Sequence, residues 1–392
     1  MSIRVLDQAR LLIVVWVLST FFTWLLIPAR GFGQTPPVGP TPSPPPPTVG
    51  PTPLPPPLIG QPPVAGQPPA ARLEGPERFF VVPSFSIAGV YDDNLFGTAT
   101  QPESVWVSRF SPRLQLLMRP EPELSITADY SFASEVFPEV PEENLVLANQ
   151  HAELTIVSTP NTATTLTLGG EYGRTHTPRD LILATGLEFG REVAENIVAN
   201  ARLERRLGPA DLLGLDYRFS RLDFETELPT DSHAWGAGLT HRIGRLGSLT
   251  LRGGVQRLEG EFRPLYGAAV AREFRSGSLG ASYSRDSYAI PTEGRVDTDA
   301  FALNLERRLG RSARLTISPG VSLNRGFDLD VTVYRINVQL ACPVGRWLTI
   351  RGSYDGNFQR SMRNGLGDAS GGDLDHNVAG LDFTISRPTR PR

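Results

Sequence analysis

The side chains that metal and acid–base chemistry require are sparse in this sequence. Its five histidines stand far apart, and no two have the spacing of metal ligands: His151, His176, His233, His241 and His376. A hydrolase or acyltransferase of membrane lipid would need a Ser/His pair oriented by a third polar group. His176 and His233 have serines in their neighbourhood, but we interpret both as solvated loop imidazoles. The sequence therefore predicts no catalytic residues, no cofactor and no metal site.

Cysteine, glycine and net charge narrow the function classes further. Cys342 is the single cysteine, which excludes a disulfide framework and a cysteine-based metal cluster. The glycine pairs that begin at Gly169 and Gly253 lie inside segments with strand character, so we interpret them as bends or space and not as phosphate-binding loops. The formal net charge of -3 provides no basic surplus to neutralise phosphates, and nucleic acid is not an expected partner.

Charged and polar residues recur at every second position of segments whose remaining positions are apolar. In residues 124–132, Leu124, Ile126 and Tyr130 alternate with Ser125 and Asp129. A repeat of two residues is typical of β-strands with one apolar and one polar face. The same alternation recurs in residues 165–173, 212–220, 248–256, 278–285, 314–324 and 347–355.

Short and long connections alternate between these segments. Each segment follows a short junction rich in Pro, Gly or Asn, residues that supply the backbone angles of tight turns. Longer polar stretches separate successive pairs of segments, at residues 92–104, 134–144, 174–192, 223–232, 259–264, 285–298, 324–330 and 355–376. Eight long loops and seven short turns join about sixteen strands, with both chain ends on the short-turn side, which is the topology of an outer-membrane barrel.

The predicted fold is therefore all-β, a transmembrane antiparallel β-barrel of about 16 strands. Aromatic residues of the apolar face support it, because they gather beside the long loops, where they would form a ring at one membrane interface. A soluble β-sandwich has no reason to segregate its aromatics in this way. The ring comprises Tyr91, Trp106, Tyr130, Tyr172, Tyr217, Trp235, Tyr266, Tyr283, Phe301, Tyr334 and Tyr354.

The polar face of these strands supplies the candidate functional residues, which would point into the barrel. A barrel of sixteen strands is wide enough for an aqueous channel. Charges of both signs suit either a hydrated pore or a self-neutralised, plugged interior, and the sequence leaves both open. The candidate lumen-lining residues are Arg109, Arg113, Asp129, Glu153, Glu171, Arg202, Glu204, Asp216, Arg218, Arg252, Glu306, Arg335, Arg351 and Asp382.

The N-terminal fifth of the chain has a different composition. Arg4 and Arg10 precede an apolar run over residues 11–26 and then small residues, the order of a secretory signal peptide. An uncleaved inner-membrane anchor is the competing interpretation. Residues 34–78 are proline-rich and predict a disordered, extended periplasmic linker. We therefore expect a signal peptide at 1–33, the linker at 34–78, the barrel at 79–387 and a short tail at 388–392.

One stretch of sequence also resembles a known family. Residues 81–98, and Asp92-Asp93-Asn94-Leu95-Phe96 above all, resemble the first strand and loop of an outer-membrane β-barrel porin family associated with exopolysaccharide and exosortase gene clusters. The resemblance would extend from Phe79 to the end. One departure concerns the C-terminus, since outer-membrane barrels commonly end in an aromatic residue and this chain does not. Phe383 and Ile385 would take that role if the last residues form a periplasmic tail.

The resemblance implies a location in the outer membrane and a porin-like or polysaccharide-export-associated channel. Its implied partners are outer-membrane lipid and polysaccharide or export machinery. An alternative of a different class is a non-conducting structural or adhesion barrel that binds partners through its long loops or its proline-rich arm. An outer-membrane lipid enzyme is a third hypothesis, for which the sequence offers no convincing triad.

Overall fold

The computed structural model describes residues 79–95, 97, 102–176, 185, 187, 193–225, 229–290, 294–310, 312–326, 330–345, 347–361 and 373–386. The expected signal peptide, proline-rich linker and C-terminal tail lie outside these residues. Among the described residues, no helix is long and apolar enough to cross a membrane. What they form is a set of long strands and one short 3-10 helix, Pro141–Glu143.

Sixteen strands run through the described part of the chain. They are β1 Phe79–Asp92, β2 Val105–Glu121, β3 Leu124–Val136, β4 Leu145–Asn161, β5 Thr164–Thr175, β6 Ala194–Arg206, β7 Asp211–Phe224, β8 Thr230–Ile243, β9 Gly247–Leu258, β10 Glu261–Phe274, β11 Gly277–Ile290, β12 Gly294–Leu309, β13 Ala313–Gly326, β14 Asp330–Val344, β15 Leu348–Ser361 and β16 Leu374–Ser386. Each pairs antiparallel with its neighbours in sequence.

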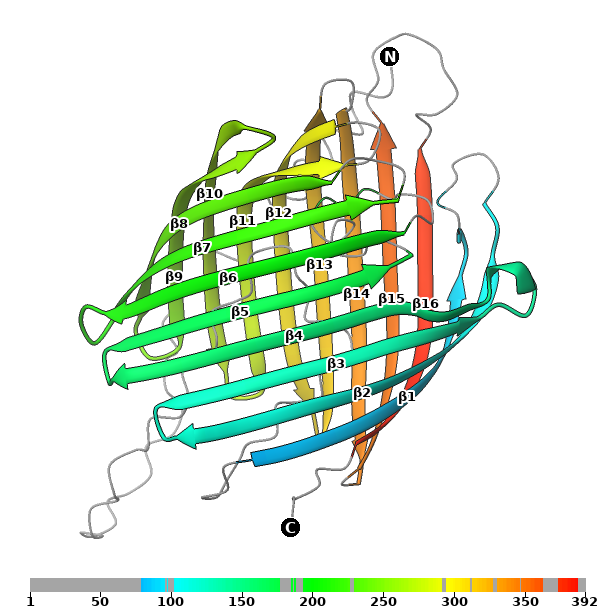
Figure 1. Ribbon diagram of the computed structural model, residues 1–392, viewed down its shortest axis with the longest axis horizontal. Coiled ribbons are helices and arrows are strands. Elements are labelled where there is room, and N and C mark those ends of the chain that lie inside the picture. The colour runs from blue at the N-terminus through cyan, green and yellow to red at the C-terminus, as the bar shows by residue number, and fades with distance from the viewer. Residues whose placement is uncertain are drawn as a thin grey trace, which may run out of the picture. The chain divides into compact units, whose positions relative to one another are not determined.

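The ring closes between the first and the last strand (Figure 1). β1 pairs with β16 over nine residues, in a register that sets Ile87 opposite Phe383 and Gly89 opposite Leu381. Closure removes the free sheet edges that would otherwise expose unpaired backbone groups to lipid. The predicted fold class, an antiparallel barrel of about sixteen strands, is thereby confirmed.

The period of two in the sequence becomes an outer and an inner face. Leu215 is 49% exposed and Leu251 is 51% exposed, although both belong to the middle of long strands. Large apolar residues that remain this exposed on every side of a closed barrel are those that face the hydrocarbon of a membrane. The polar residues that alternate with them therefore line the interior. This is the architecture of transmembrane barrels of outer membranes.

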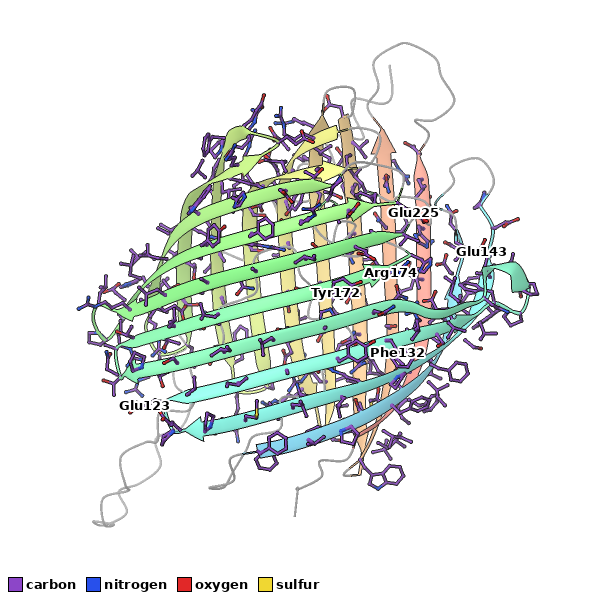
Figure 2. All side chains as sticks on the ribbon, in the orientation of Figure 1. Glu123, Phe132, Glu143, Tyr172, Arg174 and Glu225 are labelled. Atoms are coloured by element: carbon purple, nitrogen blue, oxygen red, sulfur yellow. The ribbon has the colours of Figure 1, made fainter. Side chains whose placement is uncertain are left out.

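Aromatic side chains pair across neighbouring strands on the outer face. Tyr91 and Trp106 lie opposite each other with ring centroids 5.2 Å apart. Tyr217 and Trp235 are paired in the same way at 5.8 Å. Tyr91 and Trp106 stand at the long-connection end of their strands, as predicted for a ring of aromatics at one interface, whereas Tyr217 and Trp235 lie near the middle of β7 and β8. Figure 2 shows the two ends, with Glu123 in a short turn at one and Glu143 and Glu225 at the other.

The predicted long loops are too long at several places. Four of the residues 259–264 belong to β10, because β9 and β10 are joined by a two-residue turn in which Glu259 and Gly260 adopt positive φ of 53° and 85°. The stretches 285–298 and 324–330 also lie mostly in strands. These strands continue beyond the apolar belt, where the outer face no longer meets hydrocarbon and its residues no longer need to be apolar. The backbone ladder continues even though the sequence pattern stops.

One seam of the barrel is open near its long-connection end. The ladder between β10 and β11 ends at the pair Tyr266 and Arg285. Beyond it, β10 continues with β9 as far as Glu261, and β11 continues with β12 as far as Ile290. Pro264 lies in the unpaired part and has no backbone N–H to donate. Among the described strands, this is the one place where both of two neighbouring strands continue for five residues beyond the last residue pair of their ladder.

Candidate functional site

The candidate functional site is the inner wall of the barrel. All fourteen residues proposed from the sequence occupy strand positions that alternate with exposed apolar residues, as Asp382 does between Leu381 and Phe383. They are distributed over eleven strands: Arg109 and Arg113 on β2, Asp129 on β3, Glu153 on β4, Glu171 on β5, Arg202 and Glu204 on β6, Asp216 and Arg218 on β7, Arg252 on β9, Glu306 on β12, Arg335 on β14, Arg351 on β15 and Asp382 on β16.

Strands β2 and β3 carry the most buried ion pair of this wall. The Nε of Arg113 donates to the Oδ2 of Asp129 at 2.7 Å, and the Asp129 side chain is only 4% exposed. One step toward the long connections, Arg109 donates through Nε and Nη2 to a single oxygen of Glu135, at 2.9 and 2.7 Å. Asn149 donates to the same oxygen at 3.2 Å. These contacts satisfy the guanidinium and carboxylate groups along the wall.

A second group of pairs lies on β14, β15 and β16. Arg335 contacts Asp355 with two nitrogens, at 3.1 and 3.3 Å, and Asn337 donates to the same carboxylate at 3.3 Å. Arg351 stands 3.8 Å from Asp382 on the adjacent strand. Glu135 and Asp355 were not among the residues proposed from the sequence, since both fall in stretches taken as loops. Their cross-strand partners became apparent only with the register.

On β6 to β9, glycine creates room for the charged side chains. Arg252 pairs with Asp216, which belongs to the strand next but one. A Cβ on Gly236, in the strand between them, would meet the Asp216 carboxylate at 2.7 Å. Glycine at this position therefore lets the pair lie flat against the wall instead of projecting toward the barrel axis.

The remaining candidates have looser or separate partners. His151 lies 3.6 Å from Glu171 and 3.9 Å from Glu153. Arg202 contacts Glu204, two residues along its own strand, at 2.9 Å. Glu306 is 3.3 Å from Arg314 near the short-turn end. Arg218 joins none of these pairs.

A third sector of the wall carries little charge at mid-barrel. On β10 to β13, most inward positions at mid-barrel are small residues, so this sector is flat and leaves space in the lumen. The cross-section of the lumen is therefore asymmetric, with charged side chains on two arcs and a smooth arc between them. The small residues are Gly267, Ala269, Gly280, Ser282, Ala300, Ala302, Ser318 and Gly320.

At the long-connection end the lumen contains a cluster of apolar side chains. Leu187, from the connection between β5 and β6, is 4% exposed and belongs to a buried cluster. The cluster draws on β6, β7, β11, β12 and β14, so it joins walls from different sides of the ring. Its members are Leu187, Ala194, Phe224, Ile290, Val296, Val331 and Val333, with Leu222 and Tyr288 packed against them. We call this set the apolar constriction.

A hydrogen bond secures the same connection to the far wall. The Asn324 side chain donates to the backbone oxygen of Thr185 at 2.8 Å and accepts from the Thr298 hydroxyl at 2.7 Å. All three residues are almost completely buried. In a ring of sixteen strands, β13 with Asn324 lies opposite β5 and β6, between which Thr185 stands. The chain therefore reaches across the lumen at this point.

A second apolar cluster occupies the same end beside the closing seam. Phe137, just after β3, is 1% exposed and packs on Val90, Val105 and Val107 of β1 and β2. Its backbone N–H donates to the Asn144 side chain at 2.6 Å, which holds the turn in place. The long-connection end is thus narrowed from two sides.

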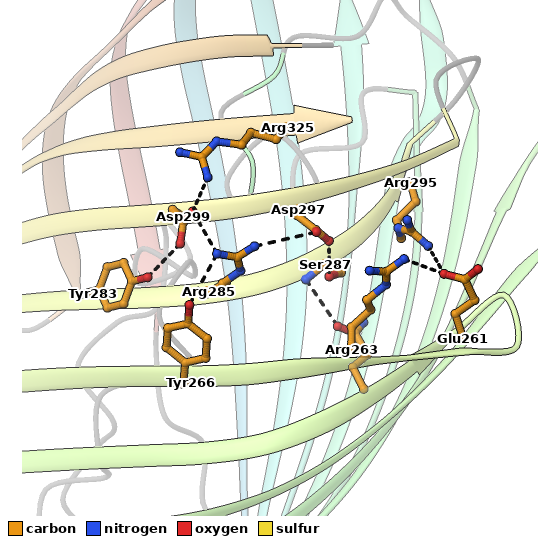
Figure 3. A network of polar contacts seen from close by, with 11 residues as sticks. Glu261, Arg263, Tyr266, Tyr283, Arg285, Ser287, Arg295, Asp297, Asp299 and Arg325 are labelled. Carbon is orange, nitrogen blue, oxygen red and sulfur yellow. Dashed lines mark hydrogen bonds and ion pairs between the residues drawn. The ribbon is translucent and has the colours of Figure 1, made fainter. Parts of the chain in front are cut away.

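The structure also assembles polar residues on the outer face that the sequence analysis missed (Figure 3). Arg285 lies 3.6 Å from Asp299 and 3.9 Å from Asp297, and Arg325 lies 3.6 Å from Asp299. Tyr283 donates to Asp299 at 2.7 Å. These residues occupy outward positions just beyond the aromatic ring, where headgroups replace hydrocarbon and charge is tolerated. A break in the apolar alternation was the signal that could have identified them.

One group has the composition of a metal site. Potential ligand atoms of Asp92, Asp93 and His376 lie within 4.8 Å of one another. Existing hydrogen bonds account for the group, because His376 contacts Asp92 at 2.9 Å and Asp93 accepts from the backbone and side chain of Asn377 at 2.6 and 2.7 Å. These bonds join β1 to β16. The cluster therefore serves the closing seam of the barrel.

Comparisons with known proteins show similarity in structure only. No family model matches the sequence, and no curated protein matches it. Among solved structures, a bacterial polysaccharide outer membrane secretin covers 79% of this chain with 98% of its own, at 11% identity and a TM-score of 0.44. The match to OccK3 of Pseudomonas aeruginosa covers 79% of this chain and 96% of that one, at 16% identity and a TM-score of 0.47. The match to OmpF of Salmonella typhi in complex with daunomycin covers 78% of this chain and 97% of that one, at 10% identity and a TM-score of 0.47.

Proposed function

We propose that this protein is a passive channel of the outer membrane, with the charged inner wall as its lining. One observation carries the proposal: among the residues that the structure describes, the ion pairs of the wall run along it, within one strand or between strands that are neighbours or next but one. Arg113 to Asp129 and Arg335 to Asp355 are examples. A plugged barrel would be expected to hold pairs that cross the lumen, because such pairs fill the interior and neutralise it.

Partial exposure of the same side chains supports a hydrated lumen. The side chains of Arg109 and Glu153 are 34% and 39% exposed although both point inward. Ions held in a dry interior cost several kcal/mol each, so mixed charge at this level of exposure is favourable only in contact with water. On this view the apolar constriction limits flow, and the charged wall below it selects among solutes.

The finer proposal is that the channel is associated with export of polysaccharide. It rests on the resemblance of residues 81–98 to the porin family described above and on no contact within the barrel. The proposal includes the lumen-lining role of the fourteen candidates. It also includes the expected partners, which are outer-membrane lipid and polysaccharide or export machinery.

Single-channel recording in a planar lipid bilayer tests the proposal. The refolded full-length chain should produce stepwise current in KCl. Absence of current from protein that shows heat-modifiable gel mobility would reject the channel in favour of a structural barrel. For the finer proposal, a purified acidic polysaccharide added to one side should block the current reversibly, whereas a small neutral sugar should not. A channel that polysaccharide never blocks would retain the first proposal and remove the second.

A further inference from the structure

Arg218 differs from the other arginines proposed for the lumen. It lies on the inner face of β7, opposite Asn200 of β6 and Ala234 of β8, neither of which carries charge. Each of the other six has a carboxylate oxygen within 4 Å: Arg109, Arg113, Arg202, Arg252, Arg335 and Arg351. Within the described residues Arg218 has none. Its Nε is buried and makes no hydrogen bond.

The carboxylates nearest in the wall make no direct ion pair with Arg218. Asp216, two residues before it, is taken by Arg252. Asp286, on the inner face of β11, interacts electrostatically with both Arg218 and Arg252 but forms an ion pair with neither. Arg218 therefore feels the field of Asp286 without a direct contact to its carboxylate, which leaves donors of Arg218 available for another acceptor.

The position of Arg218 along the barrel increases the effect of its charge. Ser220, Leu222 and Phe224 follow it on the inner face of the same strand, and the last two belong to or pack against the apolar constriction. Tyr288, which also packs there, interacts electrostatically with Arg218. Beside apolar side chains the local dielectric is lower than in open water, so a single unpaired cation acts over a longer distance.

We propose that Arg218 is an anion-binding point at the inner side of the apolar constriction, where the guanidinium pairs transiently with a small anionic solute such as a carboxylate or a phosphate. The planar fork of five N–H donors suits both groups. The inference rests on the proposed channel function and adds to it a solute class and a residue that determines selectivity.

Reversal potentials in a KCl gradient test the proposal against a matched control. Arg218→Gln and Arg335→Gln each remove one positive charge from the inner wall, so an effect of net charge alone would be equal in the two variants. We expect Arg218→Gln to shift selectivity toward cations by clearly more than Arg335→Gln. Asp286→Asn, which removes a carboxylate that interacts electrostatically with Arg218, should shift selectivity toward anions. Equal shifts in the two arginine variants would overturn the proposal.

A second measurement does not depend on conduction. The folded full-length barrel is treated with phenylglyoxal, which modifies guanidinium groups, and the modified arginines are mapped by mass spectrometry. Arg218 should react faster than the paired Arg113 and Arg335, and inorganic phosphate should slow its reaction selectively. Selective protection without any current would reject the channel and retain the anion site. A current without selective protection would retain the channel and reject the site.

Discussion

The lumen at mid-barrel and the lumen at the long-connection end are built from opposite kinds of side chain. At mid-barrel the inward residues are charged, paired along the wall and partly exposed, as Arg109 and Glu153 are. At the long-connection end many of them are aliphatic or aromatic and almost fully buried, as Val296 and Val333 are. The same strands carry both regions, so a shift of a few residues along β12 passes from Ala300 in one to Val296 in the other.

This difference separates two tasks within one wall. A charged, wet section can distinguish solutes by sign without closing the lumen, whereas an apolar section resists flow because it binds no water. The two sections also tolerate change differently, since added charge is solvated in one and stranded in the other.

Introducing a carboxylate on β12 should separate the two regions most strongly. Val296→Asp places a charge where the side chain is 0% exposed, and we expect a loss of about 3 to 5 kcal/mol in the free energy of unfolding. Ala300→Asp, on the same strand and face, should cost little because its charge reaches water. Urea unfolding followed by gel mobility measures both. Similar losses in the two variants would contradict a wet mid-barrel.

Breaking the most buried ion pair should have the next largest effect. Arg113→Gln leaves Asp129 alone at 4% exposure, and we expect a loss of about 2 kcal/mol, reduced from the fully buried case because the Arg113 side chain is 18% exposed. The double variant Arg113→Gln/Asp129→Asn should recover part of this loss in the same urea measurement. Recovery of nothing would mean that the pair itself contributes no coupling.

Truncating the constriction should affect flow more than stability. Leu187→Ala removes the side chain that joins walls from different sides, so single-channel conductance should rise. The stability loss should be about 1 kcal/mol, below the usual range for a core leucine, because water can enter at the end of the lumen. Leu251→Ala, on the membrane-facing surface, serves as the control and should leave conductance unchanged. A conductance unaffected by Leu187→Ala would place the resistance elsewhere.

The smallest expected effect concerns the glycine beneath Asp216. In Gly236→Ala the new Cβ would meet the carboxylate at 2.7 Å, and the side chain must move away from the wall. We expect a loss below about 1 kcal/mol, because the pair can rearrange in a hydrated lumen. Gly253→Ala, where nothing lies within 4 Å, should have no effect. Equal urea midpoints for the two variants would show that the close approach does not matter.

The sequence was sufficient for the strands and their sidedness because alternation within each strand reports burial on a sheet face. It was insufficient for the ends of strands such as β9 and β10, where alternation stops before the ladder does. An ion pair such as that of Arg335 with Asp355 can be predicted only when the register between the strands is known, and a single sequence does not supply it. The apolar residues of 181–187 offered an unused signal, since aliphatic side chains in a connection imply that part of it is buried, as Leu187 is.

The open seam between β10 and β11 has a mechanical consequence. On the short-turn side of Tyr266 the barrel is a closed ring, and it resists bending because any opening breaks backbone hydrogen bonds. On the long-connection side of Tyr266 the sheet is no longer closed, because β10 and β11 are not paired there. The tip of the β9–β10 hairpin therefore has a neighbouring strand on one side only. Side-chain contacts hold it across the split, such as the 3.4 Å bond from the Ser287 N–H to Gln256. The tip of the hairpin can therefore move while the closed ring in the membrane stays rigid. The backbone amide hydrogens of the tip should be the first of the wall to exchange with solvent.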